Sequence, residues 1–248
     1  MKAVIICALL TALCAQSQTL RVLSYNLHHG EGVDGKLDLE RIAKVITAVS
    51  PDVVALQEMD SKTVRTKGVD QPAELARLTG MRAFFGAAIP LEGGNYGNAV
   101  LSRVPAVFTR NVPLPGKEPR ALMEVTLDVG GTKVAFFATH LDASRDETER
   151  IAAANRILKI AKPKTPAILA GDLNAVPDSE PLGILSKQWH RAGAPEIYPT
   201  IPVASPRRQI DYVLLRPAKR FRVVEVLVLD EAVASDHRAI LTVLELVK

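Results

Sequence analysis

Short apolar runs recur along the chain, and most have the length of a buried strand. They occupy residues 20–27, 53–56, 99–101, 122–127, 134–138, 167–170, 210–215, 223–229 and 239–246. Two of these runs flank the pair Gly130-Gly131, which predicts a β-hairpin. Because strands, hairpins and helical segments are interspersed, the pattern predicts a layered α/β domain with mixed rather than purely parallel sheets.

Three segments between these runs have the spacing and the end signals of helices. In the first, apolar residues at positions 39, 42, 43, 46 and 49 follow Asp38, which is suited to cap a helix. A second helix is expected to begin after Asp70 and to stop at Gly80. A third is expected to begin with Ser144 and Glu147 acting as a capping box.

The N-terminal residues 1–17 have the pattern of a secretory signal peptide. A short positively charged start precedes the apolar run 3–15, and small residues follow at Ala15 and Ser17, as a signal peptidase prefers. Removal of this segment leaves residues 18–248 as one domain of a secreted or periplasmic protein. An uncleaved amphiphilic anchor is the alternative interpretation.

Both cysteines, Cys7 and Cys14, lie inside this segment, so the mature chain is expected to have no thiol for a disulfide or a thiolate metal site. Leu13 is bulky where lipidation of Cys14 would need a small residue, so we expect no lipid. The net charge of +4 and the 4% of aromatic residues permit nucleic-acid binding without indicating it. We expect a monomer with no obligate protein partner.

Five short polar motifs end or follow the apolar runs. They are Tyr25-Asn26-Leu27, Gln57-Glu58, Thr139-His140-Leu141-Asp142, Gly171-Asp172-Leu173-Asn174 and Ser235-Asp236-His237. Loops at strand ends are where a packed sheet presents its chemistry. Phosphoester hydrolysis needs charge neutralised on the phosphoryl oxygens, a positioned water and a protonated leaving group. Carboxylates, amides and two histidines at strand ends therefore favour a divalent-metal phosphoester hydrolase.

Each of these residues, taken singly, also has an ordinary structural explanation. Glu58 suits a hard cation such as Mg²⁺, but a strand-end glutamate can simply be solvated. Asp172 and Asn174 would point the same way if the strand extends that far, or they could form a turn. His140 and His237 suit proton transfer near neutral pH, but either could be an ordinary surface or core histidine.

Further candidates lie outside or beside the motifs. Asp211 opens a strand, where it could orient a histidine of a neighbouring strand or be an ordinary strand-start aspartate. Arg120 follows Pro119 at a strand start, where it could grip a phosphate oxygen or form a surface ion pair. His28 and His29 follow Asn26 and could be close to a metal or merely solvated.

In order and spacing, the motifs resemble those of the endonuclease/exonuclease/phosphatase superfamily, which includes deoxyribonuclease I, exonuclease III, bacterial sphingomyelinases and inositol polyphosphate 5-phosphatases. Residues 96–103 are also similar to the central strand of that family. The resemblance extends from Arg21 to about Leu246. It implies a four-layer α/β sandwich, in which two mixed β-sheets lie face to face and are flanked by helices.

The resemblance implies a metal and phosphate site. Glu58 would be the principal ligand of Mg²⁺, with Mn²⁺ as the alternative ion, and Asn26 would support it. Asp236 would lie near a second metal position. Arg120 would match an arginine that grips the phosphate, and Asn174 would hold a phosphate oxygen.

The resemblance also implies the proton-transfer groups. Asp172 would orient or deprotonate the attacking water. His237 would contact the phosphate or serve as base, oriented by Asp211. His140 would be the leaving-group acid or a phosphate contact. Which histidine is the acid and which the base differs across the family and stays open.

Two positions depart from the family pattern. The exonuclease III branch has an aspartate where this chain has His28, so a second carboxylate on that side of the metal is in doubt. Deoxyribonuclease I has a glutamate that orients the first histidine where this chain has Asn98, which could accept only a weaker hydrogen bond. Asn98 remains a candidate for the phosphate side of the site.

These observations favour a secreted phosphoesterase that cleaves a phosphodiester or a phosphomonoester. The expected partner is its substrate, which could be a phospholipid headgroup, a small phosphate ester or a nucleic acid. A nuclease is the alternative within the same chemistry. A non-catalytic phosphate- or lipid-binding module with the same fold is an alternative of another class, although binding alone would not need both His140 and His237.

Overall fold

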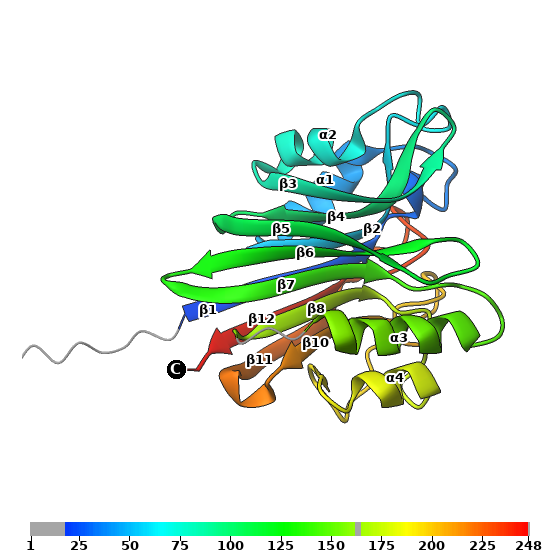
Figure 1. Ribbon diagram of the computed structural model, residues 1–248. Helices are drawn as coiled ribbons and strands as arrows, with labels where there is room; N and C mark the ends of the chain where they lie inside the picture. The colour runs from blue at the N-terminus through cyan, green and yellow to red at the C-terminus, as the bar shows by residue number, and fades with distance from the viewer. Residues whose placement is uncertain (1–17, 162–164, 248) are drawn as a thin grey trace, which may run out of the picture.

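The computed structural model describes residues 18–161 and 165–247, which form two six-stranded β-sheets packed face to face (Figure 1). The first sheet has the strand order β11-β12-β1-β2-β4-β3. Its strands are β1 (Gln18–Asn26), β2 (Val53–Ser61), β3 (Arg82–Leu91), β4 (Gly94–Ser102), β11 (Phe221–Val228) and β12 (Ile240–Leu246). The second sheet has the order β5-β6-β7-β8-β10-β9. Its strands are β5 (Ala106–Leu114), β6 (Arg120–Val129), β7 (Thr132–His140), β8 (Ala167–Asp172), β9 (His190–Arg191) and β10 (Asp211–Arg216).

Helices cover the outer face of each sheet, which confirms the expected four-layer sandwich. On the first sheet lie α1 (Leu39–Ala48) and α2 (Gln71–Thr79), and on the second lie α3 (Thr148–Ile160) and α4 (Glu180–Leu185) (Figure 1). Short 3₁₀ helices η1 (His28–Gly30) and η2 (Ala218–Arg220) complete the elements. No helix within the described ranges is long and apolar enough to cross a membrane.

Apolar side chains fill three interior regions, one between the two β-sheets and one between each sheet and its helices. Val22 of β1 and Ile168 of β8 point into the layer between the two sheets. The next residues, Leu23 and Leu169, point outward and pack against the helices. Because side chains alternate along a strand, a strand buried on both faces must be apolar at successive positions. This explains why the sequence shows continuous apolar runs.

Each sheet has one parallel strand pair at its centre. Strand β1 pairs in parallel with β2, and β7 pairs in parallel with β8, whereas all the other named strand pairs are antiparallel. A helix connects the strands of each parallel pair, α1 in the first sheet and α3 in the second. The carboxyl ends of paired parallel strands meet at one edge, so residues that end these strands are brought together.

The helix-end signals were partly right. Asp38 caps α1 by accepting from the backbone N–H of Arg41, and Asp70 caps α2. Gly80 ends α2 in the left-handed conformation at φ 66°. The capping box expected at Ser144 and Glu147 is wrong, because α3 begins at Thr148 without a side-chain hydrogen bond from its N-cap residue.

Several elements had no clear sequence signal. Strands β3, β5 and β9 and the short helix α4 were not expected. Strands β3 and β5 expose many of their side chains, so they lack the uninterrupted apolar run of a strand that is covered on both faces. The expected signal peptide, residues 1–17 with both cysteines, lies outside the described residues.

Candidate active site

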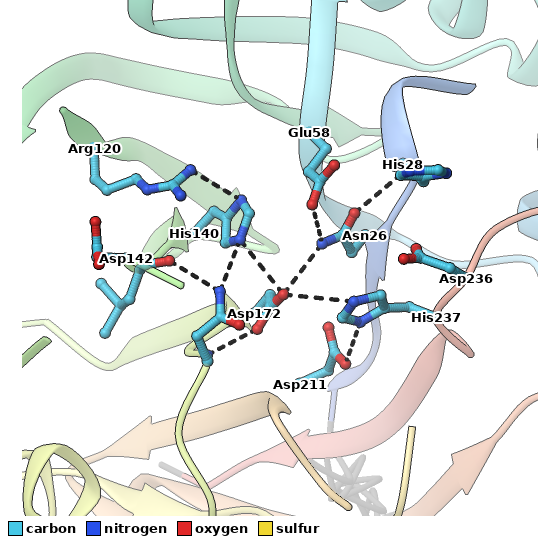
Figure 2. A network of polar contacts seen from close by, with 12 residues as sticks. Asn26, His28, Glu58, Arg120, His140, Asp142, Asp172, Asp211, Asp236 and His237 are labelled. Atoms are coloured by element: carbon cyan, nitrogen blue, oxygen red, sulfur yellow. Dashed lines mark hydrogen bonds and ion pairs between the residues drawn. The ribbon is translucent and has the colours of Figure 1, made fainter. Parts of the chain in front are cut away.

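The predicted site residues converge at the end of the sandwich where the central parallel strands finish (Figure 2). Asn26 ends β1, while His140 ends β7 and Asp172 ends β8. Asp211 begins β10 and lies directly opposite Asp172 in the antiparallel register. His237 comes from the connection between β11 and β12. Both sheets therefore contribute to one site.

Glu58 reaches this site through an irregularity in β2. The pairing of β2 with β4 shifts register between Leu56 and Met59, which marks a bulge, and Glu58 has a φ of +58°. A bulge re-aims the side chain it carries, and a left-handed non-glycine residue is a strained feature typical of functional sites. The Glu58 carboxylate accepts a hydrogen bond from the Asn26 amide, with Nδ2 and Oε1 3.0 Å apart.

Asp172 lies at the centre of the network. Its Oδ2 accepts from Asn26 Nδ2 at 3.1 Å and lies 3.5 Å from His140 Nε2 and 3.8 Å from His237 Nε2. Its Oδ1 accepts from the backbone N–H of Asn174 at 2.8 Å. Burial, and then the charge of Asp211, raise the pKa of Asp172 to about 7. A carboxylate poised near neutral pH can accept a proton.

His237 is paired with Asp211. The two are joined by a 2.9 Å contact between Nδ1 and Oδ2, and Thr200 Oγ1 donates to the same carboxylate oxygen at 2.5 Å. Burial on its own lowers the pKa of His237, but the charge and hydrogen bond of Asp211, with the charge of Asp172, raise it to about 10. The pairing with Asp211 therefore favours the charged form of the His237 ring.

His140 has the opposite electrostatic environment. Burial lowers its pKa well below the ordinary value, and the positive charges of Arg120 and His237 lower it further. Arg120 Nη1 lies 3.4 Å from His140 Nδ1, and Tyr96 Oη lies 3.5 Å from the same atom. A guanidinium can only donate, so Nδ1 faces a donor, whereas Nε2 lies 3.5 Å from the acceptor Asp172 Oδ2 and also 3.0 Å from the amide nitrogen of Asn174.

Asn174 completes this side of the site. Its Nδ2 donates to the backbone carbonyl of Leu141 at 3.0 Å and lies 3.0 Å from His140 Nε2. Its φ of +48° is left-handed, so the turn after β8 folds the amide back toward the histidine. The motif thus forms a turn, and this turn brings the Asn174 amide beside His140.

A glycine allows β7 and β8 to approach closely just beside these residues. Gly171 has a φ of +152°, and a Cβ placed on it would lie 1.9 Å from the carbonyl oxygen of Thr139. Thr139 precedes His140, and Gly171 precedes Asp172. The absence of a side chain at position 171 is therefore what places these two residues side by side.

Two predicted residues, Asp236 and Asn98, lie at the margin of the network. Asp236 is exposed, and Figure 2 shows it between His28 and His237. Asn98 is buried on β4, where its amide donates to the carbonyl of Ala121 at 3.0 Å instead of contacting His140. Arg120 and Tyr96 face the histidine nitrogen in its place.

Sequence reasoning missed two side chains that contact the site. Tyr96 was recognised as part of a strand but not as a neighbour of His140, and Thr200 lies in a loop with no motif. Asp172, Asp211 and His237 form a buried group whose candidate metal-ligating atoms lie within 4.8 Å of one another. Because His237 Nδ1 is already bonded to Asp211, we interpret this group as an oriented histidine and not as a cation cage.

The model of the Endonuclease/Exonuclease/phosphatase family matches residues 23–237. An endonuclease/exonuclease/phosphatase from Beutenbergia cavernae DSM 12333 is 30% identical, with a TM-score of 0.79 over 92% of this chain and 72% of that one. The comparison with curated proteins gives no match.

Two further solved structures share the fold at lower identity. The mannosyl-6-phosphatase Bt3783 of Bacteroides thetaiotaomicron VPI-5482 is 20% identical, with a TM-score of 0.75 over 91% of this chain and 99% of that one. The human Nocturnin catalytic domain, solved with a bound sulfate anion, is also 20% identical, with a TM-score of 0.70 over 92% of this chain and 95% of that one.

Proposed function

We propose that this chain, which belongs to the endonuclease/exonuclease/phosphatase family, is a hydrolase that cleaves phosphoesters with the help of Mg²⁺ or Mn²⁺. Members of the family are hydrolytic phosphoesterases and generally use a divalent metal. The observation that carries the proposal is the position of Asp172, whose Oδ2 is approached by Asn26, His140 and His237 together. A carboxylate between two histidines is suited to handle the attacking water.

The residues around Asn26 fit a hard cation. One neutral amide nitrogen donates to both the Glu58 and the Asp172 carboxylates, so two acidic groups face the Asn26 side chain. Asn26 Oδ1 accepts from the backbone N–H of His28 at 3.0 Å and keeps a second lone pair. Glu58 and Asn26, with Asp236 nearby, offer the oxygen ligands that Mg²⁺ prefers. A bound cation would neutralise charge on the phosphoryl oxygens.

The proton-handling residues have separate roles in this proposal. Asp172, with its raised pKa, orients the attacking water and accepts its proton. His237, kept cationic by Asp211, donates from Nε2 to a phosphoryl oxygen as negative charge develops there. The bond from phosphorus to the ester oxygen breaks as the water oxygen bonds, and the departing oxygen takes its proton from His237 or from solvent. Charge stabilised only in the transition state lowers the barrier without tightening substrate binding.

The opposite side of the site holds the phosphate. Arg120 is 7% exposed and lies beside His140, where its guanidinium can contact a phosphoryl oxygen. A neutral His140 ring carries one N–H that can donate to a phosphoryl oxygen, and the Asn174 amide nitrogen lies 3.0 Å from its Nε2. We therefore assign His140, Asn174 and Arg120 to phosphate binding, and this assignment leaves Asn98 beneath them as support.

The substrate proposed is a small phosphate ester or a phospholipid headgroup. The sulfate in the Nocturnin structure and the substrate named for Bt3783 belong to those proteins, and they support only a phosphate-sized anion as the shared ligand. We also propose a secreted or periplasmic monomer, on the basis of the pattern in residues 1–17.

The test is a substrate panel measured with Mg²⁺, with Mn²⁺ and in chelator. It contains DNA, RNA, sphingomyelin, inositol phosphates, sugar phosphates and bis(p-nitrophenyl) phosphate. The Asp172→Asn variant should lose the activity, and Asp128→Asn, a change at an exposed ion pair with Lys133, should keep it. Activity on DNA or RNA alone would favour a nuclease. Undiminished activity in chelator would refute metal dependence, and phosphate binding without any hydrolysis would indicate a binding module.

A further inference from the structure

The loop of residues 62–70, between β2 and α2, is fixed on the Glu58 side of the site. The side chain of Gln71, the first residue of α2, links two segments near the site. Its Nε2 donates to the carbonyl of His29 at 2.6 Å, and its Oε1 accepts from the backbone N–H of Asp60 at 3.0 Å. Asp60 lies two residues after Glu58, and His29 lies three residues after Asn26. The start of α2, where the loop ends, is therefore anchored to β2 and to η1, the segments that carry or directly follow the proposed metal ligands.

Arg65 is held rigidly within this loop. Its Nε donates to Asp60 Oδ2 at 2.7 Å, and its Nη2 donates to Oδ1 at 2.8 Å. Asp60 is fully buried and also accepts from Thr63 Oγ1 at 2.6 Å. The backbone N–H of Arg65 donates to Glu92 Oε2 at 2.7 Å. A guanidinium fixed along one edge keeps its Nη1–Nη2 edge free to bind a second anion with defined direction.

Tyr96 separates this arginine from the buried one. The guanidinium carbon of Arg65 lies 5.5 Å from the centroid of the Tyr96 ring. The hydroxyl at the other end of the ring lies beside His140 Nδ1, which Arg120 also approaches. Arg120 is 7% exposed, whereas the Arg65 side chain is 34% exposed. The site thus has one arginine inside, next to the histidine, and one at its rim.

The loop also carries Lys62 and Lys67, both exposed, and Lys62 lies 3.9 Å from Asp70. Arg65 differs from these lysines because its contact with Asp60 fixes the direction of its guanidinium. Anchoring a loop needs only the edge of Arg65 that faces Asp60. The free edge, stacked on a ring that leads into the site, has no structural purpose of this kind.

We propose that Arg65 is a specificity-determining residue that binds a second anionic group of the substrate, a carboxylate or phosphate separate from the phosphoester that is cleaved. This inference rests on the proposed function for the identity of the first group. It narrows the substrate class to esters that carry two anionic groups. Arg120 binds the group at the reaction centre, and Arg65 binds the other at the rim.

The test compares matched ligands that differ by one carboxylate. The pairs are glycerol 3-phosphate with 3-phosphoglycerate and glucitol 6-phosphate with 6-phosphogluconate, which span two lengths. Binding to the whole protein is measured by calorimetry in Mg²⁺. The wild type should bind the carboxylate-bearing member of at least one pair about tenfold more tightly, the scale of a charged hydrogen bond. Arg65→Gln should abolish this preference and leave affinity for the partner ligand unchanged.

Two further variants separate binding from anchoring. Arg77→Gln is the matched control, because Arg77 makes the same two-point contact with Glu74 on α2, and it should keep the preference. Arg65→Lys keeps a charge for Asp60 but lacks the second edge, so it should lose the preference while remaining folded.

The outcomes are distinct. Equal affinity of the wild type for both members of both pairs would overturn the assignment of Arg65. A loss in Arg65→Gln that is the same for both members would reduce Arg65 to a loop anchor and overturn it as well. Preference for the carboxylate without hydrolysis of any ester would support Arg65 and refute the proposed function. No binding of any of the four ligands would overturn the assignment of Arg65, whereas the proposed function is decided by the substrate panel.

Discussion

Replacement of Gly171 by alanine tests whether the approach of β7 and β8 sets the geometry of the site. The new Cβ would lie 1.9 Å from the carbonyl oxygen of Thr139, and the oxygen belongs to the backbone of the neighbouring strand. Ordinary contacts begin near 3.4 Å, so the two atoms would have to separate by about 1.5 Å. No side-chain rotation can relieve this, and the strands themselves must move.

The expected effects follow from what flanks the contact. Forcing an extra methyl into close-packed structure costs about 1–3 kcal/mol of the free energy of unfolding. His140 and Asp172 are the next residues on the two strands, so they would be displaced on a similar scale. A misplacement of about 1 Å in a catalytic group can lower the turnover rate about a hundredfold. We therefore expect a moderately destabilised protein with a far larger loss of turnover.

The measurements are urea unfolding and kcat on the best substrate of the panel. Gly183→Ala is the control, because nothing lies within 4 Å of a Cβ there and alanine favours the helix α4 by up to about 1 kcal/mol. It should keep kcat and gain stability. If Gly171→Ala kept kcat and stability within about twofold and 0.5 kcal/mol of the wild type, the argument would be wrong.

Four other outcomes are expected. Glu58→Gln should weaken Mg²⁺ binding at least about tenfold in calorimetry while leaving the melting temperature unchanged, because this strand-end carboxylate is not part of the core. Asp172→Ala and His237→Ala should each lower kcat at least about a hundredfold. The double variant Asp211→Ala/His237→Ala should have the same kcat as His237→Ala alone, and multiplicative losses would show that Asp211 does not act through His237. In chelator, the protonated His237 should stabilise the fold fully at pH values below 6.5, the ordinary pKa of a histidine. This stabilisation should be lost as the pH rises toward the raised pKa of about 10. Urea unfolding of His237→Ala should not show this decline. Mass spectrometry of secreted protein should find a mature chain beginning near Gln18 without cysteine or lipid.

The core of the fold could be predicted because burial on both faces leaves a clear trace in sequence. The central strands are apolar at successive positions, and Asp38, Asp70 and Gly80 mark helix ends by local chemistry. Strands β3 and β5 could not be predicted in the same way, since their exposed side chains remove that trace. Their places depend on pairing with β4 and β6, which is a tertiary effect.

The candidate site was predictable as far as its residues end strands. Asn26, His140 and Asp172 are adjacent to apolar runs, and the parallel pairing of those strands brings them together. The contacts of Tyr96 and Thr200 arise between segments far apart in the chain, and neither residue has a local signal. The electrostatic difference between the two histidines is likewise a product of packing, because it depends on which charged side chain lies beside each ring.

Because the site is divided between two sheets, its turnover rate should depend on how the apolar residues between the sheets pack. Asn26 and Asp172 belong to opposite sheets, as do the β11–β12 connection that carries His237 and the strand that carries Asp211. The relative positions of these site residues therefore depend on the packing between the two sheets, which involves residues such as Val22, Phe136 and Ile168. Conservative substitutions at such apolar positions, remote from any substrate, should tune turnover. On heating, a shift of one sheet relative to the other should abolish the activity at a lower temperature than the loss of secondary structure.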